Sequence, residues 1–329
     1  MSAPRETVLP LSSAEKIATY QLLPPNGLAI EVAQATHRIN LINTWGPTTI
    51  FPGARVLEIG CGQGNCTAVL AEAVGPQGHV DAFDPAPPDY GSPFTLAQAQ
   101  AHISQSEIGK RVSWHRSKPL HEPRGRHDPA GEVEEAGWDV AVLTHCIWYF
   151  KRPEELNELL SYLANGIKTG GKLCIAEYAL RATEMAAVPH LLAALARGTL
   201  EAHRESNENI QNLVSPGEIK EAAMKCRWKL DSEALLVPGK GLMDGQWETG
   251  SVVTERFGWQ MEESPSSDDD ERNRQSHMRV ESVLRSARAA VLAAVEAIGG
   301  IKETRTMDVW TGVFSVDPNY TDSSGPGEQ

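Results

Sequence analysis

Residues 56–65 read VLEIGCGQGN, a short apolar run that stops at three glycines spaced by single residues. The run predicts a buried strand over Arg55–Ile59, and Asn65 suits the cap of a helix that continues to Val74. A glycine-rich turn between a strand and a helix lets a ligand approach the main chain, and the helix N-terminus offers free N–H groups to a negative group. The stretch therefore predicts a nucleotide-like ligand at this turn.

The spacing of the glycines restricts that ligand. The dinucleotide fingerprint requires G-x-G-x-x-G, whereas Gly60, Gly62 and Gly64 are followed by Asn65 where the third glycine should stand. This spacing disfavours NAD. Glu58, at the end of the strand, would repel a pyrophosphate and attract a cationic amino group. The expected ligand carries charges of both signs.

Outward from this turn, apolar strand-like runs alternate with helix-like segments. The strands are expected over His79–Phe83, Val112–His115, Trp138–Thr144 and residues 172–178, and the helices over residues 94–108 and from Pro153 to the pair Gly170-Gly171. Such alternation is typical of an α/β fold with a doubly wound, mostly parallel sheet and crossover helices.

The second half of the sequence is less regular. A helix over Pro216–Lys225 is expected to run into a strand over Trp228–Leu236, and residues 307–316 are expected to form a final strand. The acidic, serine-rich residues 263–276 predict a mobile loop, and the tail, residues 319–329, is expected to be disordered. Residues 278–298 predict a long helix whose apolar stripe is core, formed by Val280, Val283, Leu284, Ala287, Val291, Leu292 and Val295.

Composition restricts the class of protein. A chain of 329 residues with 41% hydrophobic residues can bury a substantial core. No apolar run has the length of a membrane span and the N-terminus lacks a signal-peptide pattern, so a soluble, cytoplasmic protein is expected. Five scattered cysteines without a C-x-x-C pair indicate reduced thiols. A net charge of −13 disfavours nucleic acid and anionic membranes as partners.

The pattern E-x-G-x-G-x-G after an apolar strand resembles the first motif of class I S-adenosylmethionine (SAM)-dependent methyltransferases. Residues 80–85 (VDAFDP), 138–145 (WDVAVLTH) and 171–175 (GKLCI) resemble the second, fourth and fifth strands of that family. The late pair of strands resembles the antiparallel hairpin that closes its sheet. The resemblance implies a seven-stranded, mostly parallel sheet with an antiparallel final hairpin, and SAM as the cofactor.

The resemblance also implies which residues bind the cofactor. In the family an acid at the end of the second strand holds both ribose hydroxyls. Asp84, just past the strand, fits this role better than Asp81. Successive side chains of a strand point to opposite faces of the sheet, so Asp81 is expected on the face opposite that of Ala82. Cys61 is interpreted as a small filler inside the loop. The expected cofactor contacts are Glu58, Gly60, Cys61, Gly62, Gly64, Asn65, Asp84, Pro85, Thr144 and His145.

No metal site is expected. The histidines His115, His121 and His127 recur in one polar segment, but none of the known metal-ligand spacings is present.

The segments around the motif suggest how the chain is organised. Leu191, Leu192 and Leu195 give the segment after the fifth strand an apolar side, as expected of a substrate cover. The expected parts are an N-terminal helical lid (1–49), a SAM-binding core (50–180), a helical substrate cover (181–215), a segment that completes the sheet (216–318) and a tail (319–329).

The methyl acceptor is expected to be a small organic molecule. The sequence lacks the N-P-P-Y type motif of enzymes that methylate exocyclic amines and the paired-glutamate loop of arginine methyltransferases, and it resembles methyltransferases of specialised metabolism that act on oxygen, nitrogen or sulfur. His145 follows the fourth strand, where it could act as a base or orient the substrate. The expected wall residues are Tyr20, Trp148, Tyr149 and Tyr178.

Two other functions stay open at this stage. One is a SAM-binding protein of the same fold that transfers no methyl group and acts as a regulator or in another reaction. The other is a NAD-dependent oxidoreductase, which the glycine spacing disfavours.

Overall fold

The strands form one twisted sheet. The computed structural model describes residues 7–119, 137–204, 206, 208–254, 257–258 and 271–320. Within them lies a seven-stranded sheet of order β3-β2-β1-β4-β5-β7-β6. The strands are β1 (Arg55–Ile59), β2 (His79–Phe83), β3 (Val112–His115), β4 (Trp138–Thr144), β5 (Ile167–Tyr178), β6 (Trp228–Leu236) and β7 (Val309–Val316).

The sheet is parallel from β3 to β5, and β7 runs antiparallel to both of its neighbours, β5 and β6. This confirms the predicted fold class. The strand order reverses between β1 and β4, so the carboxyl ends of these two strands form a switch point, where ligands of open α/β sheets bind. The glycine turn follows β1 at this point.

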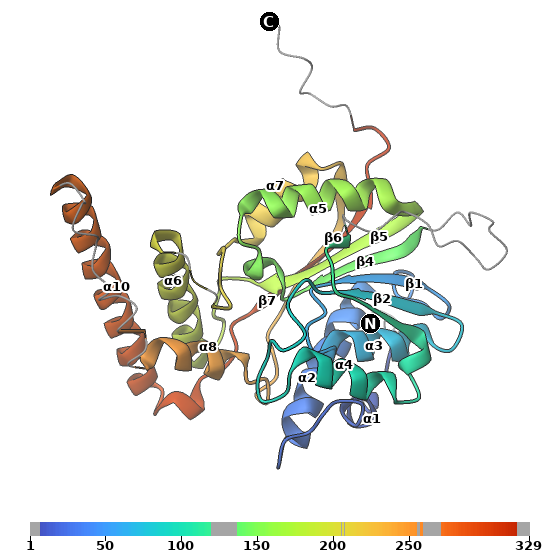
Figure 1. The fold of residues 1–329 in the computed structure, drawn as a ribbon, viewed down its shortest axis with the longest axis horizontal. Helices are drawn as coiled ribbons and strands as arrows, with labels where there is room; N and C mark the ends of the chain where they lie inside the picture. Colours follow the sequence, from blue (N-terminus) through green and yellow to red (C-terminus); the bar gives the residue numbers. More distant parts are fainter. Residues whose placement is uncertain are drawn as a thin grey trace, which may run out of the picture.

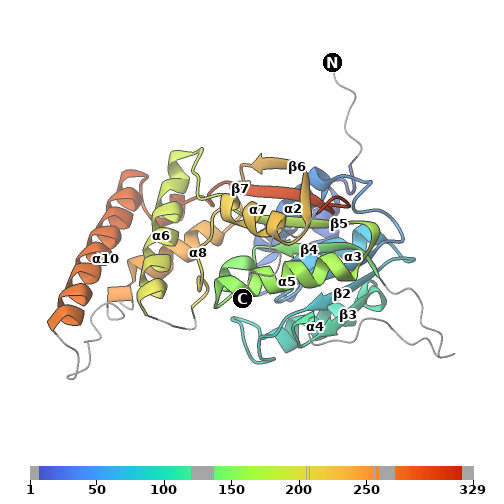
Figure 2. The same ribbon diagram turned by 90° about the horizontal axis from the view of Figure 1, so that it is seen from above.

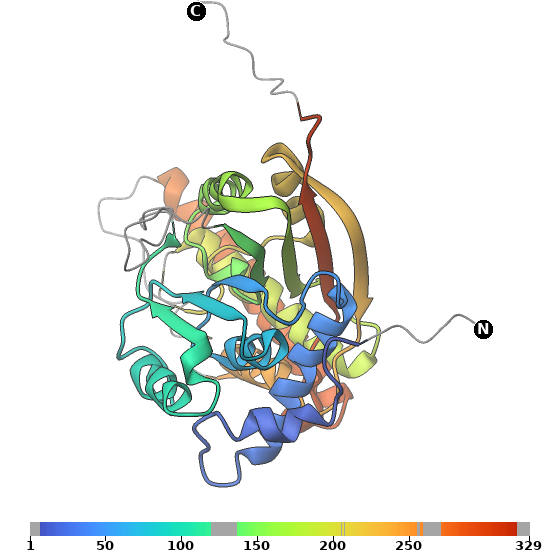
Figure 3. The same ribbon diagram turned by 90° about the vertical axis from the view of Figure 1, so that its right-hand side faces the viewer.

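Helices cover both faces of the sheet (Figures 1 and 3). The helices are α1 (Ser13–Ala18), α2 (Leu28–Trp45), α3 (Asn65–Val74), α4 (Leu96–Ser104), α5 (Pro153–Gly166), α6 (Val188–His203), α7 (Pro216–Lys225), α8 (Asp244–Val253) and α10 (Glu271–Ala297). Alternate strand residues face opposite layers: Val56 packs in the apolar cluster of α1, α2 and α3, and Leu57 in that of α5 and α7.

The helices α6, α8 and α10 stand together beside the sheet and form what we call the cover (Figures 1 and 2). They share a small apolar cluster of their own, formed by Ala193, Ala196, Leu200, Val252, Phe257, Leu284 and Val291. The cover therefore has a core separate from the two that flank the sheet.

Three local predictions need correction. The cap of α3 is Gly64 in the left-handed conformation, and Asn65 is the first helical residue. The pair Gly170-Gly171 does not end α5: the helix ends at Gly166 and β5 already begins at Ile167. The predicted helix over residues 94–108 is shorter at both ends: a capping box at Thr95 starts α4 at Leu96, and the helix ends at Ser104.

The apolar side predicted for the segment 181–215 and the core stripe predicted for residues 278–298 were partly wrong. Leu195 is 44% exposed, and α6 buries alanines instead. In α10, Val283 is 57% and Leu292 41% exposed, and the helix begins at Glu271, inside the predicted loop. Of the predicted loop, residues 263–270 lie outside the described residues. The same holds for residues 321–329, which make up most of the predicted tail. None of the helices in the described part of the chain combines the length and apolarity that a bilayer span requires.

Candidate active site

The three glycines of the turn are required for different physical reasons. All three have positive φ angles, of 69°, 53° and 94°. A Cβ atom on Gly60 would lie 2.4 Å from Cβ of Cys146, and one on Gly64 would lie 2.5 Å from Ile103. A Cβ on Gly62 would meet no protein atom within 4 Å. Gly60 and Gly64 therefore serve packing, whereas Gly62 leaves the main chain open to a ligand.

Asp84 lies directly against this turn. Its Oδ2 accepts a hydrogen bond from the N–H of Gly62 at 2.8 Å, and its Oδ1 accepts one from the N–H of Ala86 at 2.9 Å. Asp81, the competing acid, is buried and accepts from Nε1 of Trp138 at 3.0 Å within the sheet. Of the two carboxylates, only that of Asp84 is held at the glycine turn by these contacts.

Glu58 is buried at the end of β1. It accepts a hydrogen bond from the hydroxyl of Thr67 at 2.6 Å. Burial raises the pKa of Glu58 to about 7, although the bond from Thr67 lowers it. A cationic group placed beside Glu58 would restore its charge. Burial also raises the pKa of the Cys61 thiol, which keeps that residue a protonated filler.

These features fit SAM. The open side of Gly62 gives the ligand access to the main chain, Asp84 offers a carboxylate suited to hydroxyl groups, and Glu58 offers one suited to an ammonium group. Thr144, also expected at the cofactor, is buried beside them, with its hydroxyl 3.6 Å from Sγ of Cys66. Pro85 is exposed next to Asp84.

The N-terminal segment crosses the glycine turn. Nε2 of Gln21 donates to the carbonyl of Gly64 at 3.2 Å, and Nδ2 of Asn65 donates to Glu31 of α2 at 2.8 Å. Tyr20 is turned elsewhere: its hydroxyl donates to Glu107, which pairs with Lys16. The segment thus touches the motif through Gln21 and Glu31, two residues of the expected lid that sequence analysis did not single out.

Arg38 of α2 also belongs to this region and was missed. One of its terminal nitrogens donates to Gln34, while its Nε is buried without a hydrogen-bond partner. Its charge is one of the influences that lower the pKa of Glu31, although burial raises that pKa overall. Arg38 is a half-buried cation on α2, close to the acids of the site.

His145 follows β4 with a φ of 51°, and its N–H donates to the carbonyl of Ala176 at 2.9 Å. Its Nε2 lies 2.9 Å from Nε2 of His37 on α2, and its Nδ1 lies 3.6 Å from a carboxylate oxygen of Glu177. The ring of Tyr178 is tilted against it, with centroids 4.5 Å apart. A strained backbone thus holds the imidazole between α2 and β5.

The structure brings two of the predicted wall residues to His145. Tyr178 is buried, and Trp148 packs against it with centroids 5.2 Å apart. Nε1 of Trp148 donates to the carbonyl of Val214, which fixes the indole. Tyr149, the residue after Trp148, is 47% exposed.

The cover adds two polar residues that sequence analysis missed. His190 of α6 is fully buried with its ring edge-on to Tyr178; its Nδ1 accepts from the N–H of Met307 at 3.0 Å and its Nε2 has no hydrogen-bond partner. Burial lowers the pKa of His190 to about 4, so the ring is neutral. Asp244 of α8 accepts from Gln34 at 3.0 Å, and its Oδ2 is buried without a partner.

No three histidine, cysteine or acidic side chains gather as metal ligands within the described part of the chain. His115 contacts Asp81 at 3.3 Å, and His121 and His127 lie outside that part. All five cysteines are free and buried.

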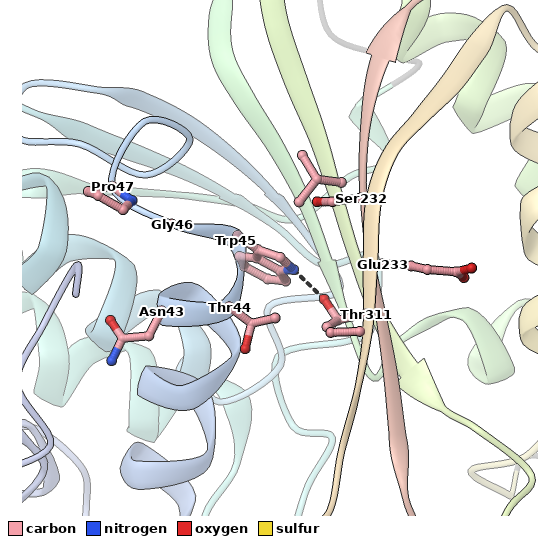
Figure 4. A pocket seen from close by; sticks show the side chains of 10 residues that line it. Asn43, Thr44, Trp45, Gly46, Pro47, Ser232, Glu233 and Thr311 are labelled. Carbon is pink, nitrogen blue, oxygen red and sulfur yellow. Dashed lines mark hydrogen bonds between the residues drawn. The ribbon is translucent and has the colours of Figure 1, made fainter. Parts of the chain in front are cut away.

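A separate pocket of about 360 Å³ lies between the end of α2 and the antiparallel strands (Figure 4). Trp45 and Thr311 line it and hydrogen-bond to each other. Its lining contains none of the motif residues.

Comparison with known proteins agrees with this geometry. Residues 32–226 match the family model described as a methyltransferase domain. "Methyltransferase phomM'" of Diaporthe leptostromiformis is 27% identical over 89% of this chain and 79% of its own. A crystal structure of a cyclopropane-fatty-acyl-phospholipid synthase-like protein from Lactobacillus casei is 28% identical, covers 92% of this chain and 99% of its own, and superposes with a TM-score of 0.70.

A third similarity is confined to part of the chain. The tRNA (adenine(58)-N(1))-methyltransferase TrmI of Thermus thermophilus is 36% identical over 94 residues, which are 29% of this chain and 31% of its own.

The sheet with its switch point and open glycine turn defines a class I SAM-dependent methyltransferase. The family model covers more than half of the chain, and the chain belongs to that methyltransferase domain family. SAM is its cofactor, and when bound it supplies the electrophilic methyl group.

Proposed function

We propose that the protein transfers a methyl group from SAM to an oxygen, nitrogen or sulfur atom of a small organic molecule. The observation that carries the proposal is the enclosure of His145. The imidazole is contacted by His37 of the lid helix and by Tyr178, whose ring in turn meets His190 of the cover. An enclosed site suits a small acceptor, because methyl transfer requires alignment and the exclusion of water.

The residues divide between the two substrates. Glu58, Asp84 and the glycine turn hold SAM, with the ribose hydroxyls on Asp84. His145 acts on the acceptor as a base or orienting group, between walls formed by Trp148 and Tyr178. Tyr149 is assigned to the outer wall because it is half exposed.

Specialised metabolism is supported only by the similarity to methyltransferase phomM', a fungal protein. The net charge of −13 argues against tRNA as the acceptor, despite the partial similarity to TrmI. We propose that the protein acts in the cytoplasm on a free small molecule.

The test is an acceptor screen that measures S-adenosylhomocysteine. Purified protein is incubated with SAM and with separate pools of phenols, amines, thiols, tRNA and phospholipid vesicles; the vesicles are included because of the name of the Lactobacillus casei relative. Formation of S-adenosylhomocysteine with one small-molecule pool is the expected result. Turnover with tRNA or vesicles alone would contradict the proposed substrate class. Tight SAM binding without turnover in any pool would favour a SAM-binding protein that transfers no methyl group.

A further inference from the structure

Two imidazoles meet at the carboxyl end of β4. The Nε2 atoms of His37 and His145 are 2.9 Å apart, and the rings stack with centroids 5.2 Å apart. At this distance one nitrogen donates a hydrogen to the other. A single hydrogen bond between these two nitrogens therefore joins the lid helix α2 to the end of β4.

Glu177 determines which nitrogen of His145 carries the proton. Its Oε1 lies 3.6 Å from Nδ1 of His145, and its two oxygens accept the backbone N–H groups of Tyr178 and Ile147 at 3.0 and 3.1 Å. A carboxylate attracts an N–H group and repels a nitrogen lone pair. The charge of Glu177 therefore favours the tautomer of His145 with its proton on Nδ1, an atom that makes no hydrogen bond at this distance, and in that tautomer Nε2 accepts from Nε2–H of His37.

This arrangement leaves the lone pair of His37 on Nδ1. That atom makes no hydrogen bond to a described residue, although the side chain of His37 is buried. Burial, followed by the charges of His145 and Arg38, lowers the pKa of His37. His37 is thus a neutral imidazole with an available lone pair, as a general base requires.

We propose that His37 and His145 form a two-imidazole proton relay for methyl transfer, with Glu177 as its positioning residue; the relay rests on the proposed function. The X–H bond of the acceptor breaks toward Nδ1 of His37. The Nε2 proton of His37 passes to Nε2 of His145, which becomes an imidazolium beside Glu177. As the bond from X to the methyl carbon forms, the carbon–sulfur bond breaks and its electron pair stays on sulfur. The positive charge of the sulfonium is thereby replaced by that of the imidazolium.

Charged and titratable groups surround this pair on every neighbouring element. Arg38 follows on α2, Glu177 and Tyr178 lie on β5, and His190 of α6 acts on the pair from the cover. Asp244 of α8 raises the pKa of His190, against the larger lowering by burial. Glu177 is the acid closest to His145, so the relay should lose its charge balance when Glu177 is neutralised.

The first test needs no acceptor. The full chain, labelled with ¹⁵N-histidine and saturated with S-adenosylhomocysteine, is measured by long-range ¹H–¹⁵N NMR, with signals assigned by His37→Gln and His145→Gln. We expect a proton on Nδ1 of His145 and on Nε2 of His37 at neutral pH. A proton on Nε2 of His145 would overturn the relay and would leave the proposed methyl transfer untouched.

The second test uses an acceptor found in the screen. His37→Gln and His145→Gln should each lower kcat by about 10²–10⁴, and the double variant should lose little more, because the two residues act as one unit. Glu177→Gln should lower kcat and shift the acidic limb of its pH profile. Affinity for S-adenosylhomocysteine should stay within about threefold in all variants.

A matched pair provides the control. His203 and His277 likewise meet through ring nitrogens, 2.8 Å apart, but they lie in the cover and join α6 to α10. His203→Gln should leave kcat unchanged. Full activity of His37→Gln, or additive losses in the double variant, would contradict the relay and leave His145 as the only base.

Discussion

The glycine turn after β1 and the cover differ in how their residues are held. At the turn, a Cβ on Gly60 or Gly64 would collide with a neighbour, and Asp84 bonds to two backbone N–H groups. The cover has a small cluster of its own and joins the apolar cluster of α1, α2 and α3 through Ala194, and it contributes the unpartnered atoms of His190 and Asp244. The glycine turn is therefore held by close packing and backbone hydrogen bonds, whereas in the cover one polar atom of His190 and one of Asp244 have no hydrogen-bond partner among the described residues.

The sharpest way to test this difference is to add one methyl group at two positions of the turn. Gly60→Ala would place its Cβ 2.4 Å from Cys146 at a φ of 69°, so it should lower the free energy of unfolding by about 4 kcal/mol. Gly62→Ala meets no protein atom and should cost only about 1 kcal/mol for its positive φ, while weakening SAM binding. Urea denaturation measures both; equal losses would contradict the separate roles of the two glycines.

A second comparison sets Asp84 against Asp81. Asp84→Ala should weaken binding of S-adenosylhomocysteine by about 2–4 kcal/mol, through the loss of charge-assisted hydrogen bonds to the ribose. Asp81→Ala removes the partner of Trp138 and should lower stability with little effect on affinity. Isothermal titration calorimetry provides the measurement. An unchanged affinity in Asp84→Ala would transfer the ribose contact to Asp81 or to another residue.

On the side of the cover, acid should destabilise the protein through His190. Burial lowers its folded-state pKa from 6.5 to about 4, so between these values the unfolded chain binds a proton that the folded chain does not. The free energy of unfolding should be fully retained above pH 6.5 and should fall by on the order of 3 kcal/mol as the pH decreases to 4. His190→Gln removes this contribution, and urea titrations of both proteins from pH 4 to 7 measure it. If the free energy of unfolding fell equally with pH in both proteins, His190 would make no contribution to the acid sensitivity.

The smallest expected effects compare two leucines of α10. Leu284 is buried in the cluster of the cover, and Leu284→Ala should lower stability by about 2 kcal/mol. Leu292 is 41% exposed, so Leu292→Ala should change stability by less than about 0.5 kcal/mol. Thermal unfolding compares the two. A large loss at Leu292 would indicate that its surface is covered in solution.

The parallel half of the fold could be predicted because its signals are local. Buried strands such as β1 and β4 are mostly apolar runs followed by glycine or polar residues. The start of β5 could not be predicted, since Gly170-Gly171 resembles a stop but lies next to an irregular pairing of Ile167 with Trp138. The sequence of α10 contains more apolar residues than the packing of the cover buries, so apolarity alone did not predict which of them are buried.

The site was predicted only as far as its motif extends. The turn and Asp84 follow strands in a recognisable pattern, and the structure places them together. His37 is separated from His145 by 108 residues, and no pattern in α2 distinguishes it from an ordinary helical histidine. Arg38, His190 and Asp244 reach the site in the same way, through helix packing that depends on the whole fold.

The long connection between β6 and β7 has a consequence for engineering. These strands pair antiparallel up to Leu236 and Val309, so the chain leaves the sheet and returns to it at adjacent points. The two ends could be joined by a short hairpin turn, which would excise α8 and α10 without altering any parallel strand. Equally, a different helical unit could be spliced in at the same two positions. The strand pair is thus an exchange point, at which α8 and α10 can be replaced while the parallel half of the sheet is conserved.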